Sequence, residues 1–276
     1  MENLIQSKLL KLDEILASFE RVAVAFSGGV DSAFLLHCAH ERLGDRAVAA
    51  TAETPLVPSD EIEAASSFAT EKNIEHVIIP IDLFQNSAVV SNPSDRCYHC
   101  KLDIFRAILD FAASRGIPHV IEGSNSDDRN DYRPGMRALA ELGVRSPLME
   151  AGLTKDEIRR AARGRGLSAW SRPAGPCLAT RVPHGVAITR KMLDAIDRAE
   201  RYLRGLGFSE VRVRHHGDLA RIEVPRQDRA RLCDHFAEIA ARLKSHGFRY
   251  ITLDIEGYRR GSMNRTPDGE EADGQG

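Results

Sequence analysis

The first 150 residues alternate between short apolar runs and longer segments with helical spacing. Strands are predicted where the runs are rich in valine, isoleucine and alanine, at 21–26, 47–52, 76–82 and 119–124. Helices are predicted where apolar positions recur every three or four residues, over 3–19, 59–72 and 101–116. Another helix is expected directly after the SGGVDS segment that follows the first strand.

This alternation predicts an α/β fold with a doubly wound parallel sheet, because crossover helices cover both faces of such a sheet. A fifth strand is expected at 144–148, and Thr154 is expected to cap the helix that follows it. Ligands of doubly wound sheets bind beyond the carboxyl ends of the strands. The chemistry is therefore expected in the loops that follow the strands.

From about residue 186 the pattern is that of a second, smaller α+β domain. A helix with apolar positions from Ile188 to Leu203 precedes a candidate hairpin, a helix near 227–245 and a strand at 250–256. The predicted domains are therefore 1–185 and 186–264. Residues 265–276 are polar and glycine-rich, and we expect them to be disordered.

Charge and composition narrow the class of protein. The 276 residues carry 38 lysines and arginines against 40 aspartates and glutamates, a net charge of −2. This balance argues against a dedicated nucleic-acid binder. No apolar run approaches the roughly 18 residues that span a bilayer, and no signal peptide is recognisable, so we expect a cytoplasmic protein without a membrane partner. Five cysteines in such a chain do not suggest a disulfide framework.

The segment SGGVDS at 27–32 has the features of a phosphate-binding loop. It joins a strand to a helix, whose first turn presents unpaired backbone N–H groups and the positive end of the helix dipole. Gly28 and Gly29 let a phosphate approach the backbone, and Ser27 and Ser32 offer hydroxyl donors. Asp31 is expected either to cap the turn or to hold it through bonds to the backbone. The Walker motif is absent. The alternative is a tight turn without a ligand.

Three cysteines lie in segments that suggest chemistry. Cys97 and Cys100 form a CxxC motif just ahead of a predicted helix, which suits a metal pair, an iron–sulfur pair or a redox dithiol. Cys177 lies in a proline-rich loop flanked by Arg172 and Arg181, whose positive charges favour a thiolate. Cys38 and Cys233 lie on predicted helices and are most simply core residues.

After a first parallel strand, SGGVDS resembles the pyrophosphate loop (PP-loop) of the ATP-pyrophosphatase superfamily, whose members cleave ATP between the α and β phosphates. EGSNSDD at 122–128 is similar to a second segment of that superfamily near the nucleotide and metal. The resemblance implies that Asp127 and Asp128 help to bind the nucleotide and Mg²⁺, an ion that prefers oxygen ligands. The alternative for both residues is an acidic solvent loop.

Four segments in order, SGGVDS, RCYHCK, EGSNSDD and SRPAGPCLATRVPHG, together with RVRHHGDLARIEV at 212–224, resemble the LarE family of ATP-dependent sulfur transferases. That family acts in the biosynthesis of the nickel-pincer nucleotide. The resemblance implies that the enzyme adenylates a carboxylate of pyridinium-3,5-dicarboxylate mononucleotide, releases pyrophosphate and delivers sulfur to give a thiocarboxylate. Cys177 is the expected catalytic thiol.

Two routes of sulfur delivery are open. In the first, Cys97, Cys100 and Cys177 hold a [4Fe–4S] cluster, whose fourth iron is free to carry sulfide. In the second, Cys177 gives up its own sulfur and becomes dehydroalanine, which makes the protein a carbon–sulfur lyase. The cysteine count favours the cluster. A zinc site using these cysteines with His99 or His184 is a weaker alternative, because structural zinc takes four ligands at regular spacing.

Charged residues of the second domain are expected to bind the substrate. Arg212 and Arg214 are two residues apart in a predicted strand and share one face, where paired guanidinium groups suit a phosphate. Arg181 is expected at the same site, and Glu200 and Glu223 match acidic positions near the active site of the LarE family. The alternative is an ordinary charged strand face.

The expected partners follow from this resemblance. They are a small mononucleotide substrate, a sulfide source, a downstream nickel-insertion protein and further copies of the chain in a homo-oligomer, often a hexamer in that family. No nucleic acid is expected. Two alternatives stay open: a PP-loop enzyme that 2-thiolates tRNA, which should carry a basic surface, and a non-catalytic adenine-nucleotide sensor.

Overall fold

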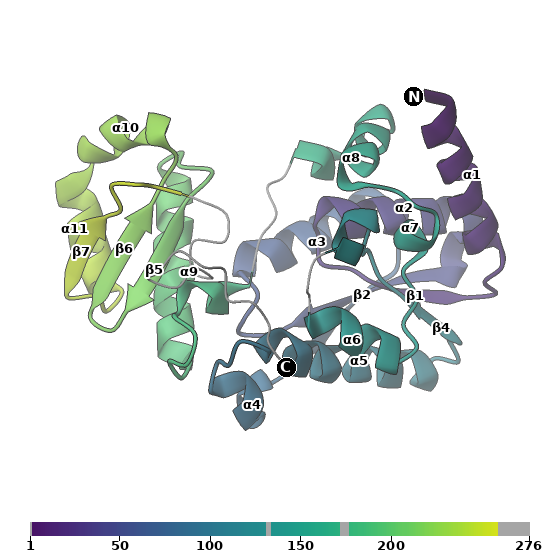
Figure 1. Ribbon diagram of the computed structural model, residues 1–276, viewed down its shortest axis with the longest axis horizontal. Coiled ribbons are helices and arrows are strands. Elements are labelled where there is room, and N and C mark those ends of the chain that lie inside the picture. The colour runs from purple at the N-terminus through teal and green to yellow at the C-terminus, as the bar shows by residue number, and fades with distance from the viewer. Residues whose placement is uncertain (1, 131–133, 172–176, 259–276) are drawn as a thin grey trace. The chain divides into compact units, whose positions relative to one another are not determined.

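The computed structural model describes residues 2–130, 134–171 and 177–258, and the chain divides into two compact units. Unit 1 comprises Met1–Val89 and Asp95–Gly175, and unit 2 comprises Val90–Ser94 and Pro176–Gly276 (Figure 1). The sequence places the domain boundary at 185/186, whereas the contacts place it at 175/176 and assign a short earlier segment to unit 2. The tail at 265–276 lies outside the described residues.

Unit 1 is built on a four-stranded parallel sheet with the order β3-β2-β1-β4. Its strands occupy the four predicted runs, as β1 (Val22–Ala25), β2 (Ala47–Glu53), β3 (His76–Pro80) and β4 (His119–Ile121). The predicted fifth strand at 144–148 is wrong. A single bridge joins Ile121 to Arg145, and the chain then enters a helical turn at Pro147, which has no N–H to donate to a ladder.

Helices cover both faces of this sheet, which confirms the doubly wound arrangement (Figure 1). One face carries α1 (Glu2–Ala17), α2 (Val30–Leu43), α3 (Ser59–Glu71), α7 (Pro147–Glu150) and α8 (Lys155–Gly164). The other carries α5 (Arg96–Ser114) and α6 (Pro134–Glu141). The short α4 (Ser87–Val90) precedes α5. In β1, Val22 and Val24 pack into the first core and Ala23 into the second, as the twofold alternation of a strand requires.

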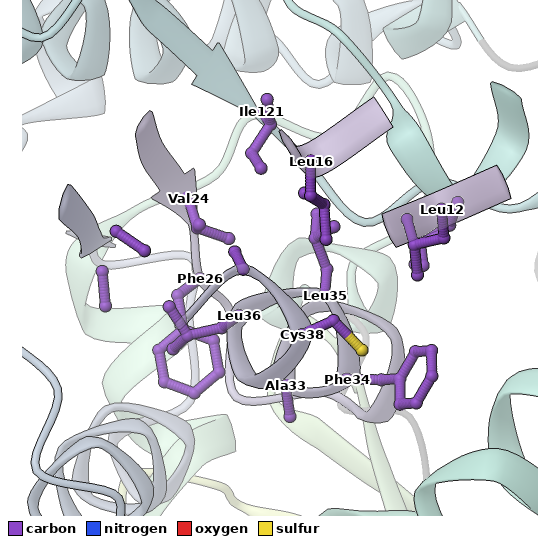
Figure 2. Close-up of a cluster of buried hydrophobic side chains, with 14 of the residues drawn as sticks. Leu12, Leu16, Val24, Phe26, Ala33, Phe34, Leu35, Leu36, Cys38 and Ile121 are labelled. Atoms are coloured by element: carbon purple, nitrogen blue, oxygen red, sulfur yellow. The ribbon is translucent and has the colours of Figure 1, made fainter. Parts of the chain in front are cut away.

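Leucines of α1 pack against α2 and share with β1 the buried cluster shown in Figure 2. Cys38 of α2 lies in this cluster with 8% of its surface exposed. Burial raises the pKa of its thiol to about 12. Cys38 is therefore an inert core residue, as predicted.

Unit 2 is a three-stranded sheet packed against helices. Its elements are α9 (Arg190–Gly205), β5 (Arg212–His216), β6 (Leu219–Glu223), α10 (Arg229–Cys233), α11 (Phe236–Ser245) and β7 (Tyr250–Leu253). The hairpin β5–β6 is antiparallel, and β7 adds parallel to β6. The predicted helix at 227–245 is interrupted between α10 and α11. Cys233 is exposed at the end of α10, so its prediction as a core residue is wrong.

Short 3-10 turns complete the chain at η1 (Gly44–Arg46), η2 (Leu83–Gln85), η3 (Ser126–Asn130), η4 (Ser168–Ser171), η5 (Leu178–Arg181) and η6 (Arg226–Asp228). Within the described ranges, no helix combines the length and the apolar character needed to cross a bilayer.

A strap formed by residues 90–94 belongs to unit 2 although the residues on either side of it belong to unit 1. Asn92 is fully buried with φ +55°, and its amide Nδ2 donates to the carbonyl oxygens of Pro183 at 2.9 Å and Val186 at 3.2 Å. The Asn92 carbonyl in turn accepts from Gly185 N at 2.9 Å. These bonds fix the loop that directly follows η5.

Candidate functional site

The Ser27–Ser32 loop leaves the carboxyl end of β1 and enters α2, so its predicted position at a strand-to-helix junction is confirmed. Gly28 has φ +77°, and a Cβ there would lie 3.3 Å from the carbonyl oxygen of Glu61. Glycine is thus required both by the backbone conformation and by the approach of α3. Gly29 is the N-cap residue and no side chain caps α2, so the predicted capping role of Asp31 is wrong.

Serine hydroxyls hold the loop closed on itself. Ser32 Oγ donates to the Gly29 carbonyl at 3.1 Å and accepts from Ser27 N at 3.3 Å, and the hydroxyls of Ser27 and Ser32 are 3.1 Å apart. Beneath the loop, Thr51 Oγ1 donates to the Phe26 carbonyl at 2.7 Å. The hydroxyl of Thr51 thereby binds the last carbonyl before the loop turns away from β2. The sequence does not single out Thr51, because its contact with the loop depends on the pairing of β1 with β2.

Gly123, just after β4, lies directly against the first turn of α2. A Cβ at this position would lie 2.9 Å from Ser32 N and 3.1 Å from Ser32 Cα. The loop after β4 and the Ser27–Ser32 loop therefore meet backbone to backbone. The two segments singled out in the sequence lie together at the carboxyl edge of the sheet.

Substituting Gly123→Ala is expected to lower the free energy of unfolding by about 1–3 kcal/mol, because the contacted backbone has to shift. ATP binding, measured by isothermal titration, should weaken as the first turn of α2 moves. Gly164→Ala is the matched control, because a Cβ there meets nothing within 4 Å. Its stability in urea should stay unchanged or rise by less than about 1 kcal/mol. Equal effects of the two substitutions would contradict the close approach.

The acidic residues after β4 hold their own loop and connect it to the start of α8. Asp128 Oδ2 accepts from Asn125 N at 2.9 Å, and Asp127 Oδ2 accepts from Lys155 N, the first residue of α8, at 2.9 Å. The Lys155 ammonium forms an ion pair with Asp31 Oδ2. Lys155 thus connects the loop after β4 with the head of α2, although nothing in the sequence distinguishes it from other surface lysines.

Burial raises the pKa of Asp31 above its ordinary value, and this effect prevails over the opposing attraction of Lys155. The negative charge of Asp128 acts in the same direction as burial, and Arg159 opposes it. Asp31 Oδ1 is buried without a hydrogen-bond partner among the described residues. The head of α2 therefore holds a partly desolvated carboxylate, with cations on the α8 side.

Cys97 and Cys100 lie inside the first turns of α5, rather than ahead of the helix as predicted. Cys97 is exposed and Cys100 half-buried, and a spacing of three residues places both on one face of the helix. Neither forms a disulfide. Both thiols belong to unit 1, whereas Cys177 belongs to unit 2.

Cys177 is the N-cap residue of η5, and its backbone carbonyl is the anchor of the turn. That oxygen accepts from the Thr180 hydroxyl at 2.8 Å, Thr180 N at 3.0 Å and Arg181 Nη1 at 3.1 Å. The half-buried side chain is thus carried on a fixed backbone. Arg172, the other predicted neighbour, lies outside the described residues. Across the part of the chain that the structure describes, no three histidine, cysteine or acidic side chains gather in a group able to hold a metal ion.

Arg181 is almost fully buried and forms a bidentate pair with Glu200. Arg181 Nε donates to Oε1 at 2.9 Å and Nη2 to Oε2 at 2.8 Å, with side chains that are 1% and 0% exposed. Glu200 Oε1 also accepts from Val213 N at 3.0 Å. Burial alone would raise the pKa of Glu200, but the bonds and charge of Arg181 outweigh burial and lower it. The pair links η5, α9 and β5.

Arg214 and Glu223 form a second bidentate pair across the β5–β6 hairpin, at 3.0 and 2.8 Å. Arg214 Nη1 also donates to the Thr180 carbonyl at 2.8 Å. Arg212 lies on the same side of β5 with its guanidinium 5.2 Å from the ring centre of Tyr258. Burial and the charge of Arg181 lower the pKa of Arg212.

The predicted substrate residues of unit 2 are thus brought together, and two arginine–glutamate pairs account for four of them. Arg204 and Arg221 extend the group, at 3.4 Å from Glu200 and 3.2 Å from Glu223. We call the set the arginine cluster: Arg181, Arg204, Arg212, Arg214, Arg221, Glu200, Glu223 and Asp254. Five guanidinium groups face three carboxylates, so the cluster carries an excess of positive charge.

The parallel sheet and the glycine-containing loop at the end of β1 define the class of protein as a PP-loop α/β nucleotide-binding protein. The chain is 38% identical over 266 residues to the pyridinium-3,5-bisthiocarboxylic acid mononucleotide synthase of Lactiplantibacillus plantarum, covering 95% of each chain. It is 39% identical over 264 residues to an uncharacterized protein of Synechocystis, covering 95% of this chain and 98% of that protein. The chain belongs to the LarE family and is an enzyme with sulfur transferase activity.

A more distant similarity covers the nucleotide-binding part. One of the subunits of the glutamine-hydrolysing GMP synthase of Methanoculleus marisnigri is 28% identical over 180 residues, which is 60% of this chain and 58% of that protein. No protein-family model matches the chain.

Proposed function

We propose that this enzyme uses ATP to adenylate a carboxylate of pyridinium-3,5-dicarboxylate mononucleotide and then replaces a carboxylate oxygen by sulfur. The similarity to a synthase of the bisthiocarboxylic acid mononucleotide supports the substrate. The observation that carries the proposal is the Ser27–Ser32 loop, whose Gly28 conformation and open helix N-terminus suit a pyrophosphate group.

Adenylation makes the carboxylate reactive. A carboxylate oxygen attacks the α-phosphorus of ATP, the bond between that phosphorus and the bridging oxygen breaks, and pyrophosphate leaves. Ser27, Gly28, Gly29, Asp31 and Ser32 bind the pyrophosphate side of ATP in this proposal. Asp127 and Asp128 lie beside the loop with oxygen donors of the kind that Mg²⁺ prefers, and would hold the ion against the phosphates.

Sulfur then replaces AMP on the activated carbon. In the sacrificial route, the Cys177 thiolate attacks that carbon, and AMP leaves with the electron pair of the carbon–oxygen bond. A base then takes the Cα proton of Cys177, the Cβ–S bond breaks, and its electron pair goes to sulfur. The products are a thiocarboxylate and dehydroalanine, with no oxidant or reductant required.

In the route that we favour, Cys97, Cys100 and Cys177 would hold a [4Fe–4S] cluster. The Cys97–Cys100 pair on one face of α5 fits two thiolate ligands of such a group. Such a cluster, with three protein ligands, would supply an iron able to carry sulfide and would allow repeated turnover. This route requires Cys177 to join the other two thiols and a sulfide source to reload the site.

The arginine cluster is the proposed site for the phosphate of the mononucleotide. Arg212 and Arg214 share one face of β5, and the excess positive charge of the cluster suits a dianion. Glu200 and Glu223 hold Arg181 and Arg214 in fixed orientations, which is a positioning role in the same site. Assembly into a homo-oligomer and transfer of the product to a nickel-insertion protein complete the proposal.

Iron and acid-labile sulfide in anaerobically purified protein, together with the products formed from ATP and the mononucleotide, test this function. We expect AMP, pyrophosphate and a thiocarboxylate, with about four irons per chain that are lost in Cys97→Ala and Cys100→Ala. If the protein contains no iron and Cys177 loses the mass of hydrogen sulfide during the reaction, the cluster route is wrong and the sacrificial route holds. Release of ADP in place of AMP would overturn adenylation, and thiolation of tRNA in place of the mononucleotide would overturn the substrate.

A further inference from the structure

Helix α8 is held rigidly with its first turn at the phosphate loop. Thr154 and Glu157 form a capping box at its start, and the Lys8 ammonium binds Glu157 at 2.7 Å. The backbone N–H of Lys155 is held by Asp127 at 2.9 Å. The side chains on this turn are therefore presented to the loop from a fixed backbone.

Two cations of α8 face the head of α2. Lys155 pairs with Asp31, and Arg159, one helical turn further on, also acts electrostatically on Asp31. Arg159 Nε is buried and has no hydrogen-bond partner among the described residues. A buried guanidinium nitrogen without an acceptor costs free energy, so an acceptor that is not part of the chain would stabilise it.

The carboxylates around the Ser27–Ser32 loop also indicate that an anion bound there needs cations from α8. The anion expected at the head of α2 would meet the carboxylates of Asp31, Asp127 and Asp128, which repel it. Asp31 Oδ1 has no hydrogen-bond partner among the described residues, so this carboxylate is held on one side only, by Lys155. Binding an anion here requires cations close to the loop, and α8 supplies them.

We propose that Lys155 and Arg159 bind the β and γ phosphates of ATP, and hence the pyrophosphate released, opposite the backbone N–H groups of the Ser27–Ser32 loop. In the structure Lys155 is held by Asp31. When the nucleotide binds, the Lys155 ammonium leaves Asp31 and binds a phosphate oxygen. Arg159 Nε then donates to a phosphate oxygen as well. The inference rests on the proposed ATP-pyrophosphatase function and adds two residues to its binding site.

Calorimetric titration of the full-length protein with inorganic pyrophosphate, ATP and AMP, each with Mg²⁺, tests this assignment. In Lys155→Gln and Arg159→Gln, we expect the Kd for pyrophosphate and ATP to rise about 10- to 100-fold, because a charge-assisted hydrogen bond is lost. The Kd for AMP should change less than about twofold, since AMP lacks both phosphates. Lys155→Arg should restore part of the affinity.

Arg160→Gln is the matched control, with the same change of charge on the next residue of α8. Arg160 is exposed and donates to the Asp156 carbonyl of its own helix, so its substitution should leave all three affinities unchanged. Equal weakening of AMP and ATP, or equal effects of Arg159→Gln and Arg160→Gln, would overturn the assignment. Pyrophosphate binding is measured independently of turnover, so a wild-type protein that releases ADP would defeat the proposed function while leaving this measurement decisive.

Discussion

Substituting Cys177→Ala is expected to abolish formation of the thiocarboxylate, by at least about 10³-fold, because both proposed routes need this sulfur. Release of AMP and pyrophosphate should continue, since the Ser27–Ser32 loop belongs to the other unit. The Cys177 backbone carbonyl that anchors η5 is unaffected by the change, so unit 2 should keep its stability. The measurement is the rate of thiocarboxylate formation beside the rate of AMP formation.

Cys233→Ala is the control for loss of a thiol from the same unit. Cys233 is exposed on α10 and donates to the Arg229 carbonyl in its own helix, so its substitution should leave both rates unchanged. A Cys177→Ala protein that still forms thiocarboxylate at the wild-type rate would remove Cys177 from the reaction. A loss of AMP formation as large as the loss of sulfur transfer would show that Cys177 acts before sulfur delivery.

Substituting Glu200→Gln is expected to lower the stability of unit 2 by about 3–5 kcal/mol, because it leaves the Arg181 guanidinium buried without its counter-charge. The loss should appear as a lower urea midpoint and as faster amide exchange at Val213, whose N–H is held by Glu200. Asp194→Asn on the same helix is the control. Its pair with Arg198 is exposed, so the cost should stay below about 1 kcal/mol.

The same carboxylate makes the stability of unit 2 depend on pH. The pKa of Glu200 is lowered from its ordinary value of 4.5, so the folded unit prefers the charged form. Its contribution is complete above the unfolded pKa and is lost as the pH falls toward the lower folded pKa. Between about pH 5 and pH 3, the urea midpoint of the wild type should therefore fall more than that of Glu200→Gln. An equal fall in both proteins would contradict this role.

The strands of unit 1 could be predicted because each is a short apolar run bounded by polar turns. The position of the Ser27–Ser32 loop could be predicted because its glycines stand between a strand and a helix. The position of two α8 cations beside the Ser27–Ser32 loop could not be predicted from the sequence. Lys155 and Arg159 follow Thr154 as ordinary charged residues of an amphipathic helix, and only the tertiary position of that helix brings them to Asp31. The strand expected at 144–148 failed because Pro147 begins a helical turn.

The charged residues of unit 2 were predicted as a set, but not their pairing. A strand pattern shows that Arg212 and Arg214 share a face, whereas it does not show that Glu223 lies across the hairpin from them. The buried pairs provide internal counter-charges for Arg181 and Arg214. The sequence pattern therefore predicted which residues form the arginine cluster. The fold shows that Glu200 and Glu223 orient the guanidinium groups of this cluster.

The strap around Asn92 makes the two units inseparable by a single cut. The chain passes between the units at 89/90, at 94/95 and at 175/176. After hydrolysis of the last connection, the strap stays covalently joined to unit 1 and remains bound to the rest of unit 2 through its hydrogen bonds. A fragment that begins at residue 176 would lack Asn92, and the carbonyls of Pro183 and Val186 would lose their donor. The polypeptides 1–175 and 176–276, produced together, should thus stay associated in native buffer and separate only on unfolding. Unit 2, which carries Cys177, is therefore not encoded by one contiguous stretch of the gene.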